Sequence, residues 1–473
     1  MSKAKFGMIG LGVMGRNFLL NVADSGFKCV GYDLDKEKVE ALNVEGNDFD
    51  VEGLGTLAEF VDSLESPRNI MLLVPAGKIV DAVIADLESH LDPGDLIIDG
   101  GNSHFFDTER READLNSKGF EFLGVGVSGG AKGARLGPSI MVGGKKEVYE
   151  RVAPILEGVS AKVDGEPCAA HLGSGSAGHF VKMVHNGIEY AMMQLICEAY
   201  DVMKRGIGLD NGLMSAAFER WNEGRLNAYL TEITAAILKT KDNISEEYLV
   251  EMILDTAGQK GTGRWTSEAA LVMGVPIPTI DAAVTMRQIS ALRDQRIMLD
   301  SVVGDLEEQG FPSEDTDFEM DPESLEGVLL AAFLISYAQG FALLTEASKE
   351  KGYQLDFAEI AKIWRGGCII RADLLEKFRS VFTENPEIVN LLHDPEIAAV
   401  VAFNIDEYLE FSSLAGSKRI PHMAFSSAYS YFNALRSSRL PANLLQAQRD
   451  FFGSHTYRRT DKEGIFHTEW EDE

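Results

Sequence analysis

Four polar residues in one segment have the types and the spacing of an acid–base pair. Within Gly178–Tyr190 they are Lys182, His185, Asn186 and Glu189. Seven residues of α-helix return to within about 20° of the starting direction, so the Lys182 amine and the Glu189 carboxylate lie two turns apart on one face. This face supplies a base and an acid together.

The alternative is that these residues form the solvated face of a surface helix. The residues around them argue against it, because they are apolar nearly all round, which is typical of a buried helix. They are Phe180, Val181, Met183, Val184, Ile188, Ala191, Met192, Met193, Leu195 and Ile196. A lysine and a glutamate that face inward need partners or a function. Burial also lowers the pKa of an amine from its usual value of about 10.4, which a lysine needs in order to act as a base.

The first third of the chain alternates strand and helix patterns. Apolar runs predict strands at 4–10, 28–33, 70–74, 96–99 and 121–125. Such alternation predicts a parallel sheet with right-handed crossovers. We therefore expect an α/β Rossmann domain over residues 1–176.

After residue 176, long helical patterns replace the strand patterns. They cover 177–206, 210–221, 226–239, 245–255, 281–301, 323–350, 370–382 and 400–415. We expect a large all-α domain over 177–434. The ranges 177–301 and 323–473 are candidates for two copies of one helical unit. A short C-terminal tail, 435–473, looks too extended to fold by itself and is expected to dock on another surface.

The composition limits the kinds of partner. The chain has 473 residues, which suggests two or three domains, and its 45% hydrophobic and 25% charged residues are typical of a soluble globular protein. The formal net charge of −30 argues against binding to nucleic acid or an anionic membrane surface, because both need clustered cations. An anionic ligand would need isolated arginines and lysines.

No segment is expected to cross a membrane. The longest apolar stretch, Val328–Leu344, contains Ser336, Tyr337 and Gln339, so it is expected to be a buried helix. The N-terminus passes directly into a strand pattern and lacks the features of a secretory signal. The cysteines lack metal-ligand spacing, so we expect free thiols, a cytoplasmic location and no metal site. They are Cys29, Cys168, Cys197 and Cys368.

A glycine-rich turn near the N-terminus predicts a dinucleotide-binding site. It follows the first strand, opens a helix, and is followed 18 residues after Gly15 by Asp33 at the end of the next strand. Its glycines permit a tight turn and a close approach to a pyrophosphate, whose charge meets the helix N-terminus. The turn consists of Gly10, Leu11, Gly12, Val13, Met14 and Gly15.

Asp33 favours NAD over NADP. Its carboxylate can accept hydrogen bonds from ribose hydroxyls but repels a 2′-phosphate, and neither Leu34 nor Asp35 supplies a compensating cation. Two alternatives stay open. Asp33 can instead cap the following turn, and Lys36 or Lys38 can swing toward a 2′-phosphate.

Longer motifs carry a resemblance to a known family. They are Asp99–Ser103, Gly126–Gly130, Gly178–Tyr190, Gly258–Gly263 and Leu440–His455. From about residue 4 to its end, the chain resembles the long form of decarboxylating 6-phosphogluconate dehydrogenase. The resemblance implies a homodimer of subunits with a Rossmann domain, a large helical domain and a tail that threads into the partner subunit.

The resemblance also implies a reaction, the oxidative decarboxylation of 6-phosphogluconate to ribulose 5-phosphate and CO2 with reduction of a nicotinamide cofactor. Lys182 matches the general base of the family and Glu189 its general acid. The positions that match the substrate-binding residues are Asn102, Ser128, Gly129, Gly130, His185, Asn186, Tyr190, Lys260, Thr262 and Arg287. Arg449 and His455 would come from the other subunit.

Two departures from the family pattern concern the cofactor. The family usually has Asn-Arg-Thr, whose arginine reads the 2′-phosphate of NADP, where this chain has Asp33, Leu34 and Asp35. The family also often has a lysine directly after Val74, where this chain has Pro75. We expect NAD as the cofactor, with NADP as the alternative. Besides Gly10–Gly15, the expected cofactor-binding residues are Asp33, Leu34, Val74, Pro75, Ala76 and Asn102.

Two other functions stay open. A related β-hydroxyacid dehydrogenase would share the glycine turn and the lysine helix, but it would oxidise without decarboxylating and would not need Lys260, Arg287 and Arg449 for a phosphate. A non-catalytic NAD-binding protein would have no reason to keep Lys182 and Glu189 together.

A second glycine-rich turn favours a structural interpretation. It spans Trp364–Cys368. We interpret a pair of arginines later in the chain, Arg436 and Arg439, in the same way. Buried arginines beside a glycine turn commonly tie helices together. We therefore expect these residues to support the fold.

Overall fold

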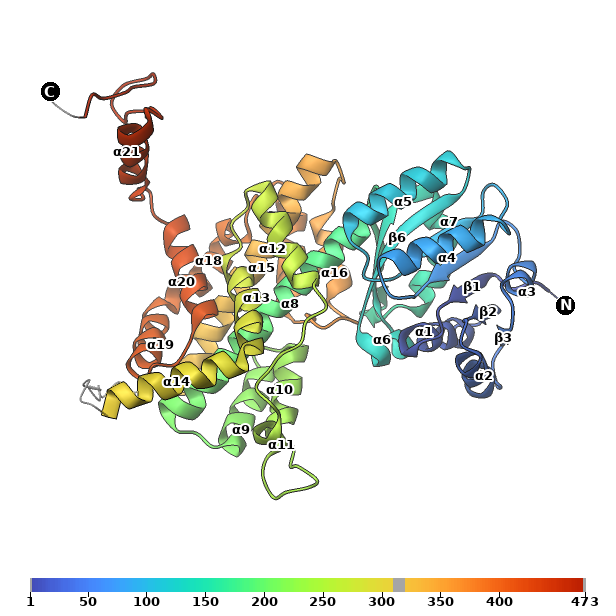
Figure 1. Cartoon of the computed structure of the whole chain (residues 1–473), viewed down its shortest axis with the longest axis horizontal. Coiled ribbons are helices and arrows are strands. Elements are labelled where there is room, and N and C mark those ends of the chain that lie inside the picture. The colour runs from blue at the N-terminus through green and yellow to red at the C-terminus, as the bar shows by residue number, and fades with distance from the viewer. Residues whose placement is uncertain (1, 309–319, 471–473) are drawn as a thin grey trace.

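The computed structural model of the chain describes residues 2–308 and 320–470. A sheet domain and a larger helical domain lie side by side, and the C-terminal tail projects from the far end of the helical domain (Figure 1). The expected fold class, a Rossmann-type α/β domain followed by a large all-α domain and a short tail, is confirmed.

A sheet of eight strands forms the centre of the first domain within the described residues, in the order β10-β7-β6-β5-β4-β1-β2-β3. All neighbouring strands are parallel except β6 and β7, which are antiparallel. The strands are β1 (Phe6–Ile9), β2 (Cys29–Tyr32), β3 (Val51–Leu54), β4 (Asn69–Leu72), β5 (Leu96–Asp99), β6 (Glu121–Ser128), β7 (Ser139–Gly144) and β10 (Ala169–Gly173); β8 (Lys162–Val163) and β9 (Glu166–Pro167) make a separate hairpin.

The predicted strands are all present, but the sequence did not predict β3, β7 or β10. Strand β3 lies at the sheet edge and is only partly buried, and β7 ends in two glycines. Glu52 and Gly53 interrupt β3, and the apolar run of β7 is limited to Ile140, Met141 and Val142.

Helices cover both faces of the sheet. They are α1 (Val13–Asp24), α2 (Lys36–Glu45), α3 (Leu57–Asp62), α4 (Lys78–Glu88), α5 (Phe105–Ser117), α6 (Gly130–Leu136) and α7 (Lys146–Val159). One apolar core lies between the sheet and α1, α2, α6 and α7, and another lies between the sheet and α3, α4 and α5. The strands between these cores are buried on both sides, which explains their continuous apolar sequences.

The second domain begins with α8 (Ala177–Asp201), which continues into a π-helical turn, η1 (Val202–Ile207). The other helices are α9 (Asn211–Asn222), α10 (Tyr229–Lys239), α11 (Leu249–Met252), α12 (Thr262–Met273), α13 (Pro278–Ala291), α14 (Arg293–Glu308), α15 (Ser324–Lys351), α16 (Phe357–Trp364), α17 (Leu374–Glu384), α18 (Pro395–Phe403), α19 (Ile405–Ser417) and α20 (Met423–Leu435), with a short 3-10 turn, η2 (Leu391–His393). Their core includes most of α8 and α15.

Helix α15 confirms the prediction of a buried apolar helix. It is the one helix of the described ranges that is long and apolar enough to span a bilayer, and 94% of its most apolar window is buried inside the protein. Its sequence is apolar all round because other helices surround it.

Several predicted helix bounds were wrong. The range 245–255 contains only the single turn α11, because Asp242 binds the backbone N–H and the hydroxyl of Ser245 and holds the preceding segment as a loop. The range 281–301 is divided between α13 and α14 at Leu292, and the range 400–415 is divided between α18 and α19 at Asn404. Both residues leave the helical backbone conformation there.

The tail was expected to be extended, and this was wrong in part. It contains α21 (Ala442–Gly453) and a small hairpin in which Tyr457 and Phe466 exchange two backbone hydrogen bonds of 2.8 Å. In Figure 1 this unit stands apart from the helical domain, beyond α20. The tail thus has local structure without resting on its own subunit.

Candidate active site

The predicted catalytic stripe lies on α8 where that helix crosses β6. Lys182 is only 6% exposed, and His185 and Asn186 are also buried, so the prediction of an inward-facing stripe is confirmed for these three residues, whereas Glu189 is partly exposed. Gly126 of β6 makes this packing possible, because a Cβ atom there would lie 2.4 Å from the Cβ of Lys182. The strand therefore passes directly over the lysine.

Neutral groups surround the Lys182 amine. Its Nζ donates hydrogen bonds to Asn186 Oδ1 at 2.7 Å and to Ser128 Oγ at 3.2 Å, and it lies 3.3 Å from His185 Nδ1. His185 Nε2 lies 3.3 Å from the same Ser128 hydroxyl. Four of the predicted residues thus form one cluster, with Glu189 Oε2 at 3.9 Å from His185 Nδ1.

Burial sets the protonation states of the predicted base and acid. Desolvation lowers the pKa of Lys182 from its ordinary value, although Glu189 and Cys368 act in the opposite direction. Desolvation raises the pKa of Glu189, against the effects of Lys182 and Arg287. The pKa of His185 is also lowered by burial, so its ring is neutral at neutral pH. A neutral amine and a protonated carboxyl group are the forms that a base and an acid need.

Ser128 ends β6, and the loop through Gly129 into Gly130, the first residue of α6, follows it directly. Gly129 has a φ of 109°, and a Cβ atom there would lie 2.6 Å from the carbonyl oxygen of Gly367. Gly367 belongs to the Trp364–Cys368 turn, and its carbonyl accepts a hydrogen bond of 2.8 Å from Ser139 N. The turn therefore supports the loop, as the structural interpretation predicted.

The arginines grouped with that turn differ in their surroundings. Arg365 is nearly buried and pairs with Glu166 and Glu376, so it ties helices together as expected. The expectation of burial was wrong for Arg436 and Arg439, which are exposed at the start of the tail. The presence of an arginine next to a helix in the sequence does not by itself establish that its side chain is buried.

The predicted phosphate-binding residues lie farther along α8, around Tyr190 in the middle of that helix. The Arg287 guanidinium carbon lies 3.4 Å from the centre of the Tyr190 ring, and Arg287 Nη1 donates to Gly258 O at 3.4 Å. Lys260 is exposed, and Thr262 begins α12 after Gly261, which provides no side-chain cap. The first turn of α12 therefore presents uncapped N–H groups near these cations, an arrangement suited to an anion.

A cavity of about 740 Å³ connects this region to the glycine-rich turn. It lies beyond the carboxyl ends of β1, β4 and β5, where the strand order reverses between β1 and β4, which is the usual ligand position in such sheets. Of the predicted residues, Gly12, Val13, Met14, Gly15, Val74, Pro75, Ala76, Asn102, Lys260 and Thr262 line it. Gly10, Leu11, Asp33 and Leu34 do not.

The glycine turn fits a dinucleotide pyrophosphate. A Cβ atom on Gly15 would lie 1.9 Å from the Gly10 carbonyl oxygen, so only glycine allows α1 to start this close to β1. Gly12 precedes α1 without a side-chain cap, which leaves the N–H groups of the first turn available to phosphate oxygens. The backbone cradle and the helix terminus both suit the expected cofactor.

Asp33 directly follows β2, outside the cavity lining, and both of its carboxylate oxygens are bound. Oδ2 accepts a hydrogen bond of 2.8 Å from Leu11 N, and Oδ1 accepts one of 2.9 Å from Asp35 N. The carboxylate therefore does cap the following turn. Lys38 Nζ lies 3.5 Å from Asp33 and 3.6 Å from Asp35, so this lysine already faces two carboxylates.

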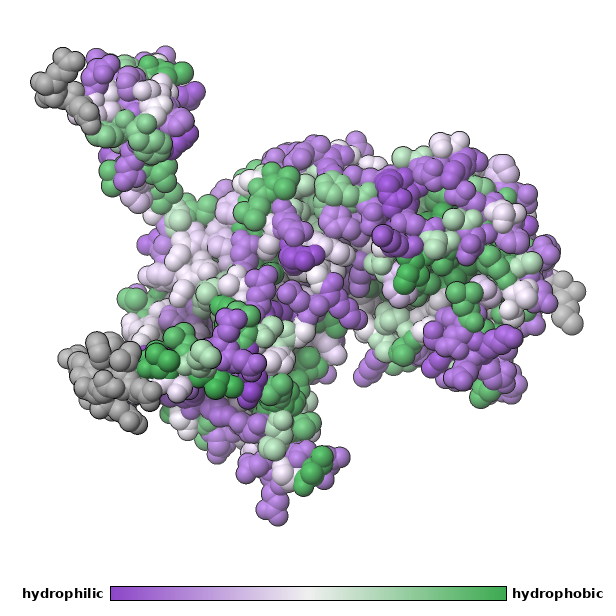
Figure 2. All heavy atoms as spheres, in the orientation of Figure 1, coloured by the Kyte–Doolittle hydropathy of each residue, from purple (hydrophilic) through white to green (hydrophobic). Residues whose placement is uncertain are grey.

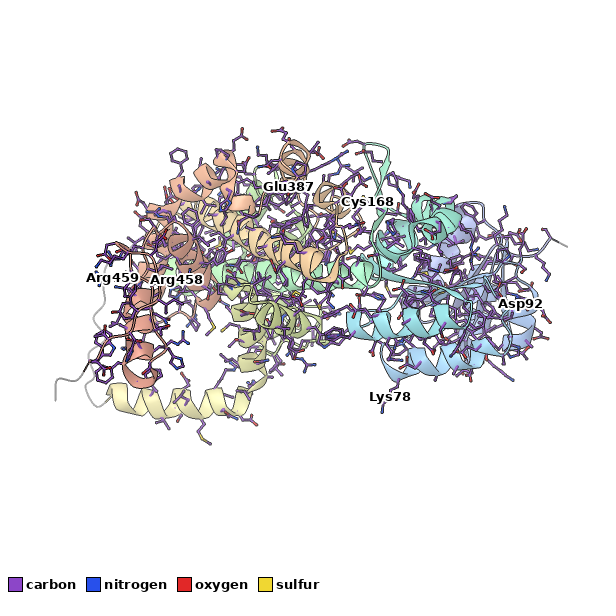
Figure 3. The ribbon with its side chains drawn as sticks, turned by 90° about the horizontal axis from the view of Figure 1, so that it is seen from above. Lys78, Asp92, Cys168, Glu387, Arg458 and Arg459 are labelled. Carbon is purple, nitrogen blue, oxygen red and sulfur yellow. The ribbon has the colours of Figure 1, made fainter. Side chains whose placement is uncertain are left out.

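Arg449 and His455 do not join the site in their own chain. Both are exposed on the tail, which Figure 1 shows at the end of the molecule away from the sheet domain. In Figure 3 the tail residues Arg458 and Arg459 lie at the opposite end from Lys78 and Asp92 of the sheet domain. The site of a single chain therefore lacks these two predicted residues.

Sequence reasoning missed a buried ionic network beside the cleft. Arg111 of α5 donates to Asp99 Oδ2 at 3.0 Å, to the Ser103 hydroxyl at 3.1 Å and to Gly77 O at 2.9 Å. It also pairs with Asp81 at 2.8 Å. These contacts join the loop after β4 to the loop that carries Asn102. The Asp99–Ser103 motif indicated in the sequence that this loop is important. Arg111 was missed because the charged helix pattern around it is that of an ordinary surface helix.

Two aromatic residues of the cleft wall were also missed. His104 and Trp265 both line the cavity, and their rings meet edge to face at 5.0 Å. His104 directly precedes α5 and Trp265 lies in α12, so their contact bridges the two domains across the cleft. No spacing rule connects positions so far apart in the chain.

Cysteines and acidic groups do not form a metal site in the part of the chain that the structure describes. The four cysteines are free, with Cys29, Cys168 and Cys368 buried and Cys197 exposed, so the prediction of free thiols is confirmed.

Comparisons with known proteins match almost the whole chain. The profile of the "NAD binding domain of 6-phosphogluconate dehydrogenase" matches residues 5–173, and that of "6-phosphogluconate dehydrogenase, C-terminal domain" matches residues 178–470. The decarboxylating 6-phosphogluconate dehydrogenase of Lactococcus lactis subsp. lactis is 49% identical over 99% of both chains. The NADP(+)-dependent decarboxylating enzyme of Bacillus subtilis is 48% identical over 99% of this chain and 100% of the relative.

A solved structure agrees with these matches. The 6-phosphogluconate dehydrogenase of Plasmodium falciparum, described in its apo form, with its cofactor NADP+ and with its substrate 6-phosphogluconate, superposes with a TM-score of 0.93. It is 42% identical and covers 98% of this chain and 100% of its own.

Fold and cleft together define a nicotinamide-dependent oxidoreductase with a separate helical domain. The similarities narrow this class. The chain belongs to the 6-phosphogluconate dehydrogenase family, and it is a decarboxylating dehydrogenase of the pentose phosphate pathway.

Proposed function

We propose that the protein converts 6-phospho-D-gluconate to D-ribulose 5-phosphate and CO2, with NAD preferred over NADP. The observation that carries this proposal is the buried Lys182, whose pKa is lowered by burial and whose amine donates to Asn186 and to Ser128, the residue after Val127 of the cavity wall. A bound nicotinamide cofactor supplies the hydride acceptor. The remaining steps need a base, an acid and an anion clamp from the protein.

Lys182 acts first as a base. Its neutral amine takes the proton of the C3 hydroxyl as the hydride leaves C3, which gives a 3-keto acid and an ammonium group. The protonated amine then donates a hydrogen bond to the C3 oxygen while the C1 carboxylate leaves as CO2, and it stabilises the negative charge that develops there. Glu189, whose pKa is raised by burial, delivers a proton to the carbon that lost CO2. The product is the ketopentose phosphate.

The substrate contacts follow from the same geometry. Ser128, Gly129, Gly130, His185, Asn186 and Asn102 bind the sugar acid beside Lys182, and Tyr190, Lys260, Thr262 and Arg287 bind the phosphate at the mouth. A forked guanidinium suits a phosphate because it can donate two parallel hydrogen bonds.

The proposed preference for NAD rests on the surroundings of Asp33. A 2′-phosphate at this edge would meet Asp33 and Asp35, and the nearest cation, Lys38, is already shared between them. Leu34 is 87% exposed and brings no charge. The relatives from Bacillus subtilis and Plasmodium falciparum carry NADP in their names, so this chain would differ from them in its cofactor.

We further propose a cytoplasmic homodimer with exchanged tails, in which Arg449 and His455 complete the partner's phosphate site. The helix α14 supports a dimer, because an apolar strip lies open on its surface. The strip consists of Ile297, Met298, Leu299, Val302 and Val303. Figure 2 shows green apolar patches along α14 and on the projecting tail. Two copies can cover these surfaces together.

Initial rates with 6-phosphogluconate test the reaction and the cofactor together. NAD and NADP are compared in parallel while reduced nicotinamide and CO2 are both measured. We expect one CO2 per hydride and a much higher kcat/KM with NAD. An Asp33→Asn, Leu34→Arg double variant should shift the preference toward NADP, since it removes a repelling charge and adds a cation. A wild-type preference for NADP would overturn the Asp33 argument.

The same assay separates the alternative functions. Reduced nicotinamide without CO2 would indicate a β-hydroxyacid dehydrogenase, and binding of NAD without turnover would indicate a non-catalytic protein. Sedimentation of the enzyme at assay concentration tests the dimer, because a monomeric active enzyme would contradict the exchange of tails.

A further inference from the structure

Asp450 is a buried charged residue in the part of the chain that stands apart from the body. It is 0% exposed, although its neighbours on α21, including Arg449, are exposed. A carboxylate that is removed from water must be compensated by hydrogen bonds. The groups that bind this carboxylate show how this part of the chain is held together.

Four donors bind the Asp450 carboxylate. Oδ1 accepts from Thr456 N at 2.8 Å and from His467 Nδ1 at 2.9 Å. Oδ2 accepts from Thr468 N at 3.1 Å and from Trp470 Nε1 at 2.8 Å. The donors lie on both sides of the hairpin, so a single side chain fastens its beginning and its end to α21.

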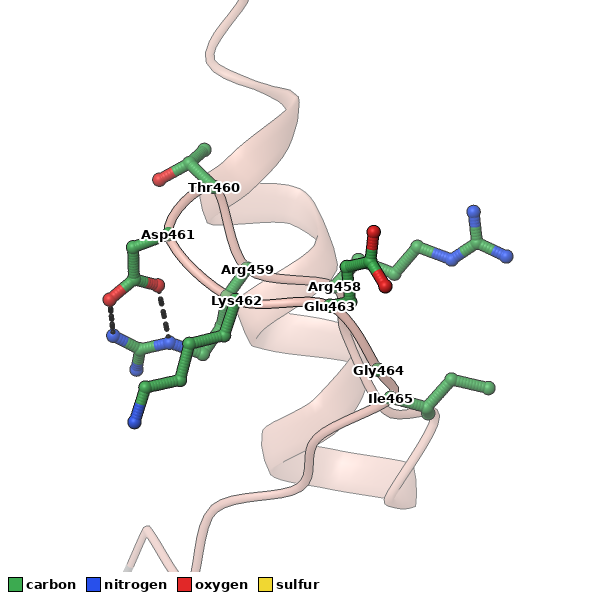
Figure 4. Close-up of a pocket in the computed structure, with 8 residues that line it drawn as sticks. All are labelled: Arg458, Arg459, Thr460, Asp461, Lys462, Glu463, Gly464 and Ile465. Atoms are coloured by element: carbon green, nitrogen blue, oxygen red, sulfur yellow. Dashed lines mark hydrogen bonds and ion pairs between the residues drawn. The ribbon is translucent and has the colours of Figure 1, made fainter.

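Further contacts complete this unit. The Tyr457 hydroxyl lies 2.5 Å from Thr468 Oγ1, and the rings of Phe451 and Trp470 lie 6.2 Å apart. Figure 4 shows the tip of the hairpin, Arg458–Ile465, bent over the helix with its charged side chains pointing outward. We call Ala442–Trp470 the tail unit. Asp450 is the one buried residue of α21, so apolar burial contributes little to this unit.

The hydrogen bonds keep Asp450 charged. Desolvation acts to raise the pKa of this carboxyl group, but the bonds from His467, Trp470 and the backbone of Thr468 and Thr456 hold it at about 2. The same bond raises the pKa of His467. Charged hydrogen bonds of this kind are stronger than neutral ones.

Asp450 also fixes the segment between the two predicted substrate residues. Arg449 precedes it directly, and His455 lies between Ser454 and Thr456, which have positive φ values of 50° and 60°. Residues other than glycine rarely adopt this conformation, so it needs support. The bond to Thr456 N and the bond from Ser454 N to the Asp450 carbonyl supply that support.

The side chain of Gln446 connects the same two positions, Arg449 and the backbone next to His455. Gln446 Nε2 donates to Thr456 O at 2.6 Å, and Gln446 Oε1 accepts from Arg449 Nη1 at 3.1 Å. The side chain of Arg449 and the backbone beside His455 are therefore held by one set of bonds, with Asp450 at its centre.

We propose that Asp450 is a positioning residue: it folds the tail unit before the tail reaches the partner subunit, and it thereby fixes the spacing of Arg449 and His455 for the substrate phosphate. This inference rests on the proposed exchange of tails. Without the Asp450 bonds, the tail would still attach through its apolar side chains, but the two phosphate-binding residues would have to be ordered at each binding event.

Steady-state kinetics of Asp450→Asn test this proposal. Loss of the charged bonds should raise the KM for 6-phosphogluconate by about 10-fold or more and leave kcat and the KM for the nicotinamide cofactor within about twofold. Sedimentation should still show a dimer. Asp461→Asn is the matched control, because this exposed carboxylate pairs only within the hairpin tip, with Arg459 at 2.7 Å, and should change nothing.

Two further variants keep the outcome decisive. Trp470→Phe removes one donor and keeps an aromatic ring, so a smaller rise in the same KM, about threefold, is expected even if Asp450→Asn folds poorly. In an Arg449→Ala background, Asp450→Asn should add little, because its effect passes through Arg449.

The proposal is overturned if dimeric Asp450→Asn and Trp470→Phe both keep the wild-type KM, or if the Asp450→Asn and Arg449→Ala effects add fully. Failure of the exchange of tails has a different signature. In that case Arg449→Ala and His455→Ala alone would leave the KM for 6-phosphogluconate unchanged.

Discussion

Lys182 and Asp450 are both buried ionisable groups, but they lie in two very different regions of the molecule. Lys182 lies inside the main body, and its bonding partners are a serine, an asparagine and a histidine that burial keeps neutral. Asp450 lies in the projecting tail and receives four hydrogen bonds. Burial lowers the pKa of the lysine, whereas donors lower the pKa of the aspartate to about 2 against burial.

The difference shows that the partners of a buried group, and not burial alone, decide its role. Without a strong counter-ion the lysine gives up its proton easily and becomes a base. With four donors the carboxylate keeps its charge and holds a fold together. Four substitutions test how far this distinction extends, from the largest expected effect to the smallest.

Lys182→Met removes the base and keeps a side chain of similar length in the apolar site. We expect kcat to fall by about 10³-fold, within the range for loss of a general base, while cofactor binding measured by fluorescence stays unchanged. Lys204→Met is the control, because this lysine follows the same helix but pairs with Glu251 near the surface. A loss below tenfold in Lys182→Met would show that burial has not made this amine a catalyst.

Glu189→Gln removes the proposed acid at the partly exposed end of the stripe. We expect kcat to fall by about 10²-fold. As pH rises, wild-type kcat falls when Glu189 loses its proton, at a pKa above its ordinary value, and this alkaline limb should vanish in the variant. Asp201→Asn on the same helix, where the carboxylate pairs with Arg205, should keep the wild-type profile. An unchanged alkaline limb in Glu189→Gln would assign the proton to another group.

Arg287→Ala tests a partly exposed cation that stacks against Tyr190. Loss of a charged hydrogen bond to the phosphate should raise the KM for 6-phosphogluconate by about 10- to 100-fold, with little change in kcat. Arg264→Ala, which removes an exposed arginine paired with Glu268, is the control. Equal effects of the two variants would mean that general charge, not a specific contact, attracts the substrate.

Arg111→Lys extends the comparison to a buried cation whose charge is balanced by neighbouring carboxylates. Like Asp450, Arg111 should act through position, because it pairs with Asp81 and Asp99 and binds Gly77 O. Lysine cannot make all these bonds, so the KM for the cofactor should rise by about three- to tenfold, with a smaller change in kcat. Arg110→Lys, at the exposed neighbouring position, should have no effect; a matching rise there would contradict the network's role.

The sequence predicted the parts of this molecule that depend on local patterns. The glycine turn between β1 and α1 and the polar stripe of α8 carry their own signals, namely glycine spacing and helical periodicity. The predicted Lys182, His185, Asn186 and Ser128 do meet in one cluster. The roles assigned to them stay predictions until the variants are measured.

The features that were missed depend on contacts between distant positions. The helix breaks at Leu292 and Asn404 carry neither proline nor glycine, so no local signal marks them. Arg111 reads as one charge among several on a surface helix, and its burial follows from loops that lie elsewhere in the chain. The tail unit was missed because its folding depends on one carboxylate whose donors come up to 20 residues later.

Direct titration of Lys182 tests the central claim. The enzyme labelled at the lysine Cε carbons is followed by NMR through pH, and the Lys182 signal is assigned by its absence in Lys182→Met. The account predicts a midpoint well below the ordinary lysine value of about 10.4, because burial without a bonded counter-ion disfavours the charged amine. A midpoint at or above that value would mean that Lys182 stays charged at neutral pH and is not the base.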